Sequence, residues 1–242
     1  MQSALYVGLS AQVALEKRLQ TIANNVANVN TAAYRTDVVK FETVLSRTGT
    51  NPVAFSSPGD NIISREAGSL TQTGNPLDVA VVGQGWLAFA GPNGTVYTRD
   101  GRLQIAPNGD LQTLTGFPVV DQGGAQITLD PNGGPLTIAR SGAITQDGNE
   151  AGTLGLFNIP ADANLDRYGN SGVVPDRPAT AITDFTRDGI RQSYVEGSGA
   201  NPMLELTRLI SASRAFDGTN SLVEGTESSL QNAIRTLGEP GK

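Results

Sequence analysis

Apolar residues near the beginning of the chain recur at alternating spacings of four and three, which is typical of a helix that packs against another helix. These positions are Leu15, Leu19, Ile22, Val26 and Val29. Residues 3–28 contain no proline and a single glycine, so nothing interrupts a helix there. The same stripe begins with Gly8 and Gln12, which would let another backbone come close.

The end of the chain carries a longer stripe of the same kind. Its apolar residues are seven apart: Leu209, Phe216, Val223, Leu230 and Leu237. Asn201 as cap, Pro202 as first helical residue and Gly238 after the last turn mark the boundaries. The pattern predicts a helix about 50 Å long. In the predicted register the alternate seam positions are Leu206, Ser213, Asn220, Glu227 and Ile234.

The middle of the chain has the pattern of short strands joined by tight turns. Turn signals such as Asn93-Gly94, Asn108-Gly109 and Asp147-Gly148 separate runs of alternating or apolar residues. The sequence therefore predicts an α+β fold, in which N- and C-terminal helices, discontinuous in sequence, pair as a coiled-coil-like layer and enclose an inserted antiparallel all-β domain. The predicted boundaries are an N-terminal helix in residues 1–35, a connector in 36–68, the β domain in 69–195 and a C-terminal helix in 196–242.

Each terminal helix has an apolar seam longer than a small domain requires, and that seam must be buried. The two helices can complete a hairpin within one chain, or pair with neighbouring subunits, or do both. Periodicity alone leaves these alternatives open.

Composition narrows the function classes. The chain has 242 residues, a formal net charge of −6, no cysteine and no histidine. The absence of these two residue types excludes thiolate nucleophiles, Ser-His triads and the common zinc and copper sites. No run of Lys or Arg could neutralise successive phosphates, and no stretch has the roughly 18 apolar residues of a membrane span. We therefore expect no cofactor, no metal, no nucleic-acid partner and no membrane insertion.

Two patterns resemble catalytic or cofactor sites. The glycines of Gly83-Gln84-Gly85 follow a strand-like run, as in a dinucleotide-binding loop, but the following residues continue as a strand rather than a helix. Several aspartates of the β domain could form an acid and base pair, as in a carbohydrate-active enzyme, yet most abut turns, where Asp serves the backbone. We expect no catalytic residue.

Asparagine is unusually dense at the end of the first helix, where Asn24, Asn25, Asn28 and Asn30 lie within seven positions. Asparagine competes with the helix backbone for hydrogen bonds. Its amide could satisfy donors and acceptors across a packed interface or end the helix, and the alternative is a solvated, fraying terminus. Residue chemistry ranks these equally.

Three stretches in order resemble the signatures of the flagellar axial proteins, the family of rod, hook and hook-associated proteins. They are residues 23–35 (ANNVANVNTAAYR), residues 74–86 continuing to 97–101 (YTRDG), and residues 196–202 (EGSGANP) followed by the terminal helix. The family usually has glycine where this chain has Ala33, and Asn-Val where it has Gly199-Ala200. Length and the opening residues resemble a proximal-rod protein, with a distal-rod or hook-type subunit as the alternative.

The resemblance implies a structural, non-enzymatic subunit of the bacterial flagellar basal-body rod. Such a subunit polymerises helically with rod proteins and copies of itself, surrounds the export channel and transmits torque. It passes the flagellar export apparatus unfolded, without a cleaved signal peptide, to the rod in the periplasm. A monomeric β binding module with a helical stalk is the alternative. The expected assembly interface is Leu15, Leu19, Ile22, Asn24, Asn25, Val26, Asn28, Leu209, Phe216, Val223, Leu230 and Leu237.

Overall fold

The computed structural model describes the backbone of residues 2–46 and 53–238, and their side chains except at 2–4, 42–46, 53, 54, 56, 58, 60, 237 and 238. The chain forms two compact units. The helix unit comprises Met1–Ala27, Asp37–Ile62 and Asn201–Lys242, and the β unit comprises Asn28–Thr36 and Ile63–Ala200. The α+β fold class, with paired terminal helices and a central antiparallel β domain, is confirmed.

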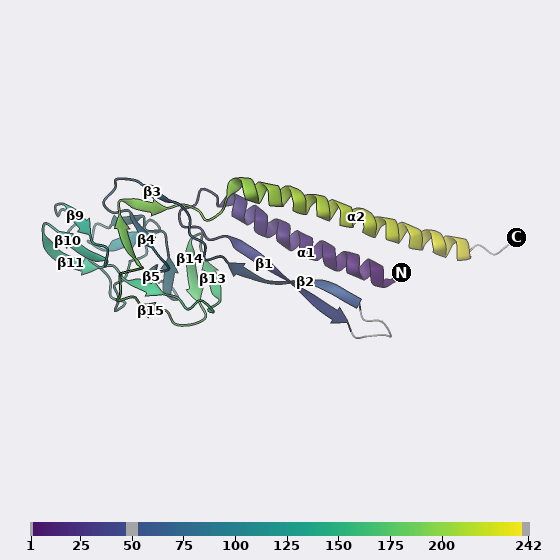
Figure 1. Ribbon diagram of the computed structural model, residues 1–242, viewed down its shortest axis with the longest axis horizontal. Helices are drawn as coiled ribbons and strands as arrows, with labels where there is room; N and C mark the ends of the chain where they lie inside the picture. Colours follow the sequence, from purple (N-terminus) through teal and green to yellow (C-terminus); the bar gives the residue numbers. More distant parts are fainter. Residues whose placement is uncertain (1, 47–52, 239–242) are drawn as a thin grey trace. The chain divides into compact units, whose positions relative to one another are not determined.

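In the helix unit, α1 (Gln2–Ala27) and α2 (Pro202–Gly238) lie side by side (Figure 1). They are antiparallel: Gly8 lies against Val223, and Asn25 bonds to Glu205 near the other end of the pair. Asn201 caps α2 as predicted, because its side chain accepts hydrogen bonds from the amides of Met203 and Leu204 at 3.1 and 3.2 Å.

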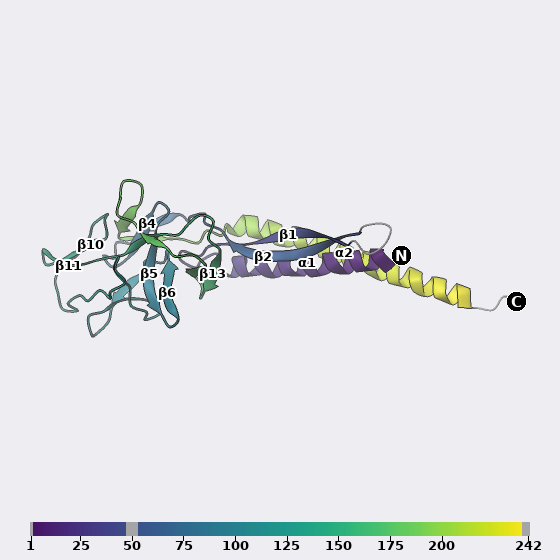
Figure 2. The same cartoon turned by 90° about the horizontal axis from the view of Figure 1, so that it is seen from below.

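The helix unit also contains two strands, β1 (Asp37–Ser46) and β2 (Val53–Ile63), which pair with each other and run along α1 in both views (Figures 1 and 2). They lie in the segment 36–68 that the sequence presented as a connector. Pro58 is compatible with β2 because a two-stranded sheet has only edge strands.

The seam of α2 differs from the predicted register at its alternate positions. Its less exposed residues are Glu205, Leu209, Ala212, Phe216, Thr219, Val223, Thr226, Leu230 and Ala233. The apolar positions seven apart are therefore correct, but the prediction of Leu206 and Ile234 in the seam is wrong, since these side chains are 44% and 70% exposed. Hydrophobicity predicts Leu206 in the seam because leucine is the more apolar residue. In the structure Glu205 occupies the seam instead, and Leu206 is exposed.

The β unit is built from short antiparallel strands. The largest sheet has the order β13-β14-β6-β5-β12-β15, and smaller sheets have the orders β11-β10-β9, β16-β4, β17-β3 and β7-β8. The bounds are β3 Leu70–Gln72, β4 Val79–Val82, β5 Trp86–Gly91, β6 Gly94–Thr98, β7 Leu103–Ile105, β8 Leu111–Thr113, β9 Leu136–Ile138, β10 Ala143–Gln146, β11 Asn149–Thr153, β12 Leu156–Asn158, β13 Leu165–Tyr168, β14 Gly172–Pro175, β15 Thr180–Ala181, β16 Gly189–Gln192 and β17 Tyr194–Glu196.

The predicted tight turns are present. Gly94 and Gly148 close the β5–β6 and β10–β11 hairpins with φ of +127° and +79°, backbone conformations that L side chains rarely adopt. The main core of the β unit consists of branched aliphatic side chains. It contains Val79, Val81, Leu87, Leu103, Leu111, Val119, Ile127, Leu129, Ile138, Ile144, Leu154, Leu156 and Ile190. No helix among the described residues is long and apolar enough to cross a membrane.

Candidate functional site

The expected interface residues of α1 lie on several sides of the helix. Ile22 and Asn25 are buried, Leu15, Leu19 and Val26 are half-buried, and Asn24 is exposed. Partners within the helix unit already occupy part of this surface, so these residues are not all available to another chain.

Asn25 uses its amide inside the chain. Its Nδ2 donates to the carbonyl of Asp37 at 3.0 Å, and its Oδ1 accepts from the amide of Asp37 at 2.9 Å. Nδ2 also lies 3.4 Å from Glu205 Oε2, and Glu205 forms an ion pair with Arg208 at 2.6 Å. The side chain thus links α1, the start of β1 and α2, which accounts for a buried polar residue at the end of a helix.

The expected seam residues of α2 face α1 with partial burial. Leu209, Phe216, Val223 and Leu230 are half-buried, and the side chain of Leu237 lies outside the described residues. Val223 Cγ2 would lie 2.8 Å from a Cβ on Gly8, so a glycine is needed where the helices approach. One turn away, Gln12 donates a hydrogen bond to Asn220.

Asn28 belongs to the β unit and follows the end of α1. Its carbonyl accepts from the amide of Thr31 at 3.1 Å, and its Oδ1 accepts from the Thr31 hydroxyl at 3.0 Å. Asn28 therefore organises the turn after α1.

Two apolar groups of the helix unit are exposed, and of their members the predicted heptad stripes had included only Leu206. They are Tyr6, Leu9 and Val13 on α1, and Met203, Leu206 and Ile210 on α2. Both groups have the spacing of three and then four residues that places side chains on one helix face. A search for a second heptad stripe beside the first would have found them.

Sequence reasoning also missed a buried ionic cluster in the β unit. Glu196 at the end of β17 is completely buried, and one of its carboxylate oxygens lies 2.8 Å from Arg35 Nη2 while the other lies 2.8 Å from Arg99 Nε. Arg35 and Arg99 are 1% and 3% exposed. The cluster carries two cations and one anion, which is costly to bury unless further partners compensate.

Backbone groups supply those partners. Arg99 donates to the carbonyls of Val81, Gly83 and Gly85 at 2.8, 2.9 and 2.7 Å. Arg35 donates to the carbonyl of Glu66, and the amide of Gly68 donates to Glu196 at 3.2 Å.

Trp86 lies beside both guanidinium groups of the cluster, with its ring centroid 5.7 Å from Arg35 Cζ and 6.0 Å from Arg99 Cζ. Burial still lowers the pKa of Arg35 to about 10, an effect that Glu196 opposes and Arg99 adds to. The favourable contacts thus compensate only part of the cost of burying this cation.

The cluster joins the three stretches on which the family resemblance rests. Arg35 ends the first stretch, Trp86 and Arg99 lie in the second, and Glu196 begins the third. No signal within any single stretch indicated this arrangement. The three stretches therefore meet at a buried ionic cluster.

Ala33, which stands where the family usually has glycine, adopts a left-handed conformation. Its φ is +55° and its side chain is fully buried. Its amide donates to the carbonyl of Glu196 at 2.9 Å, so the turn directs the chain onto β17. The turn forms with alanine at the energetic cost of an L residue in this region.

The sequence patterns that resembled catalytic or cofactor sites have structural roles. Asp188 Oδ1 accepts hydrogen bonds from the amides of Gln84 and Gly85, so the glycine loop already binds an internal carboxylate. Asp121 accepts from the amides of Gly123 and Ala125, as expected for a turn residue.

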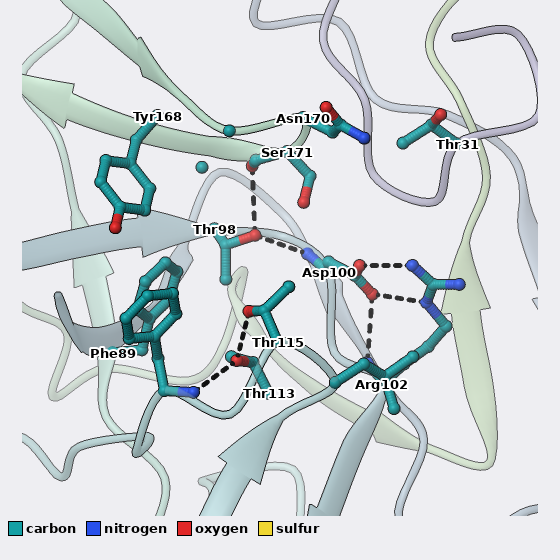
Figure 3. A pocket seen from close by; sticks show the side chains of 14 residues that line it. Thr31, Phe89, Thr98, Asp100, Arg102, Thr113, Thr115, Tyr168, Asn170 and Ser171 are labelled. Atoms are coloured by element: carbon teal, nitrogen blue, oxygen red, sulfur yellow. Dashed lines mark hydrogen bonds and ion pairs between the residues drawn. The ribbon is translucent and has the colours of Figure 1, made fainter.

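A pocket of about 340 Å³ opens in the β unit (Figure 3). Phe89 and Phe117 stack in its wall with ring centroids 5.5 Å apart, and Asp100 forms a two-pronged ion pair with Arg102 at 2.7 and 2.9 Å. The Thr98 hydroxyl donates to the carbonyl of Ser171 at 3.1 Å. These polar groups are bonded to the protein itself, so the pocket indicates no ligand class.

Comparisons with known proteins agree with this geometry. Three family models match: "Flagella basal body rod protein" over residues 5–35, "Flagellar hook protein FlgE/F/G D1 domain" over residues 80–146, and "Flagellar basal body rod FlgEFG protein C-terminal" over residues 191–236. The first and last cover parts of α1 and α2, and the second covers strands of the β unit.

Similar proteins are flagellar basal-body rod proteins of two names, FlgF and FlgG. The flagellar basal-body rod protein FlgF of Mesorhizobium japonicum is 50% identical over 98% of this chain and 99% of its own length. Those of Rhizobium meliloti and Caulobacter vibrioides are 41% and 33% identical, over 98% and 99% of this chain and 99% of each relative. The FlgG protein of Agrobacterium fabrum is 28% identical over 91% of this chain and 94% of its own length. The chain belongs to the family of the flagellar basal-body rod protein FlgF.

Proposed function

We propose that the chain is a structural subunit of the flagellar basal-body rod, which polymerises helically with other rod proteins and with copies of itself. The observation that carries this proposal is that α1 and α2, matched by rod-family models, pair through a seam in which large apolar residues are only partly buried, and leave further apolar side chains exposed. A helix pair of this kind gains stability from further burial in an assembly.

In this proposal the helix unit forms the inner layer around the export channel, and contacts between β units form the outer layer that transmits torque. The interface includes the predicted residues that the intrachain contacts leave partly accessible: Leu15, Leu19, Val26, Leu209, Phe216, Val223 and Leu230. The role is mechanical and requires no catalysis. The β unit supports it with a core of its own, which lets a subunit keep its shape under load.

The proposal includes export through the flagellar export apparatus in an unfolded state, followed by folding in the periplasmic rod. The chain suits this route because it has no disulfide to form and its β unit is built from short strands. Gly8 and Gln12, near the start of α1, contact α2, so the paired helices need these residues.

Aspartate at a seam position tests the proposal. Leu19→Asp or Phe216→Asp should leave the β unit folded and abolish rod assembly, because each places a charge in the helix pair. Basal bodies isolated from a bacterium that expresses only the variant show whether the subunit is incorporated. Ser228→Asp, which adds the same charge at an exposed position of α2, is the control. Normal basal bodies with both seam variants would contradict the proposed function.

A further inference from the structure

The chain passes between its two units four times, after Ala27, Thr36, Ile62 and Ala200. These covalent connections carry force from the helix unit to the β unit. On the β-unit side they continue into three segments: residues 28–36, residues 63–69 and residues 196–200.

These three segments are bonded to one another by their backbones. The hydrogen bonds run from Ala33 N to Glu196 O at 2.9 Å, Gly199 N to Tyr34 O at 2.8 Å, Ser64 N to Thr36 O at 2.8 Å and Gly197 N to Ser69 O at 2.8 Å. Their approach is close: a Cβ on Gly68 would lie 2.1 Å from the carbonyl oxygen of Gly197. The segments therefore form one small bundle of chain inside the β unit.

The side chains of Arg35, Glu196 and Arg99 fix this bundle to the rest of the β unit. Arg35 comes from the first segment and bonds to the carbonyl of Glu66 in the second and to the carboxylate of Glu196 in the third. Glu196 in turn holds Arg99, whose guanidinium binds three carbonyls at β4 and the loop to β5. One continuous network thus connects all three segments with the sheet.

We infer that the Arg35–Glu196–Arg99 cluster is a mechanical joint, which distributes force from the helix unit over all the chain connections at once. Bonds that are loaded in parallel must break together, whereas a segment without cross-links can be peeled away one hydrogen bond at a time. The inference rests on the proposed function, since only a subunit that transmits torque needs such a joint.

Folding stability alone does not explain the presence of Arg35. Burial disfavours its charge, its Nε has no hydrogen-bond partner, and buried ion networks can often be replaced by apolar residues of similar volume without loss of stability. Arg35→Met would leave Glu196 paired with Arg99 as a neutral pair. This variant should therefore lower the force that the β unit withstands without lowering its free energy of unfolding.

The first test compares swimming under low and high load. A bacterium whose own gene is deleted expresses the full chain, the Arg35→Met variant or Arg177→Met, which removes an exposed ion pair with Asp162 and none of the hydrogen bonds among the three segments. We expect Arg35→Met to assemble flagella and swim normally in dilute medium but to lose motility or shed flagella in viscous medium. Arg177→Met should match the unmodified chain in both. Equal swimming of the two variants in viscous medium would overturn the inference.

The second test measures force on the purified full chain. Because the chain has no cysteine, Met203→Cys on α2 and Glu150→Cys on β11 provide unique attachment points at two exposed residues. We expect Arg35→Met to lower the force at which the β unit yields, and Arg177→Met to leave it unchanged. Unchanged force with Arg35→Met would contradict the inference.

The outcomes also separate this inference from the proposed function. If the unmodified chain neither enters basal bodies nor restores motility, the proposed function fails, while the pulling experiment still decides whether the joint exists. If Arg35→Met unfolds the purified chain, Arg35→Lys replaces it in both tests, since one ammonium cannot hold Glu196 and the Glu66 carbonyl in the same geometry. If both variants unfold it, Arg35 serves stability and the inference is wrong.

Discussion

The β unit and the helix unit bury different kinds of side chain. In the β unit the fully buried residues include large aliphatic groups such as Leu111, Ile144 and Leu156. Among the described residues of the helix unit, the buried side chains are small or polar apart from Ile22, and include Ala14, Thr21, Asn25, Glu205 and Ala212. The β unit therefore has a core that can stabilise it alone, and the helix unit depends on burial from elsewhere.

The polar contacts between α1 and α2 have a use that apolar contacts would lack. Polar residues at seam positions specify the register and partner of a helix pair at a cost in stability. Gln12 with Asn220 and Asn25 with Glu205 set the antiparallel register at two points. The contrast teaches that one chain can hold a region selected for stability beside a region selected for a specific association.

The largest effect is expected in the β unit when its buried carboxylate is neutralised. Glu196→Gln leaves Arg35 and Arg99 buried without an anion, which should lower the free energy of unfolding by about 3–5 kcal/mol. Urea unfolding followed by the fluorescence of Trp86, the single tryptophan and a neighbour of both arginines, reports this directly. Asp162→Asn in an exposed ion pair should cost less than about 1 kcal/mol. Equal effects of the two changes would refute the structural role of Glu196.

An intermediate effect on stability is expected when a leucine is replaced by alanine in each of the two units. Leu156→Ala, at a fully buried position of β12, should destabilise the β unit by about 2–5 kcal/mol because it leaves a cavity. Leu230→Ala, at a half-buried position of α2, should cost less than about 1 kcal/mol in the isolated chain, since less apolar surface is uncovered.

Trp86 fluorescence and far-UV circular dichroism, recorded in the same thermal scan, report on the β unit and the helices respectively. If Leu230→Ala destabilises the isolated chain as much as Leu156→Ala does, the helix unit has a sufficient core of its own. The contrast between the units would then disappear.

The smallest effect concerns the strained turn at Ala33. Ala33→Gly should raise the free energy of unfolding of the β unit by up to about 1 kcal/mol, since a left-handed alanine costs about 1–2 kcal/mol and the lost methyl group offsets part of the gain. Ala32→Gly, at the adjacent buried residue without a positive φ, should destabilise it by about 0.5–1 kcal/mol. Urea unfolding gives the midpoint of each variant. If both midpoints shift in the same direction, the strain at Ala33 is negligible.

Local patterns predicted much of the fold. Asn93-Gly94 and Asp147-Gly148 close hairpins as expected, because the positive φ of a tight turn is a property of the residues in the turn itself. Asn201 and Pro202 marked the start of α2 for a similar reason, since capping needs only neighbours in sequence. The segment 36–68 gave no such signal, and its two strands form only by pairing with each other.

The buried cluster shows what local patterns cannot reveal. Arg35, Arg99 and Glu196 are far apart in the sequence, and each read alone is an ordinary charged residue. Their partnership depends on β17 lying beside β3 and on the chain returning after α1. Likewise, hydrophobicity placed Leu206 in the seam of α2, and only packing against α1 selected Glu205 instead.

The sequence by itself determined where the helices and most turns of this protein lie, that the fold is α+β, and that its motifs belong to flagellar axial proteins, because these depend on residues close together along the chain. Only the tertiary structure decided the register of the helix pair, the intrachain role of Asn25 and the union of three motifs around Glu196. These depend on which distant groups can share a buried space, where each unpaired charge or amide would be costly.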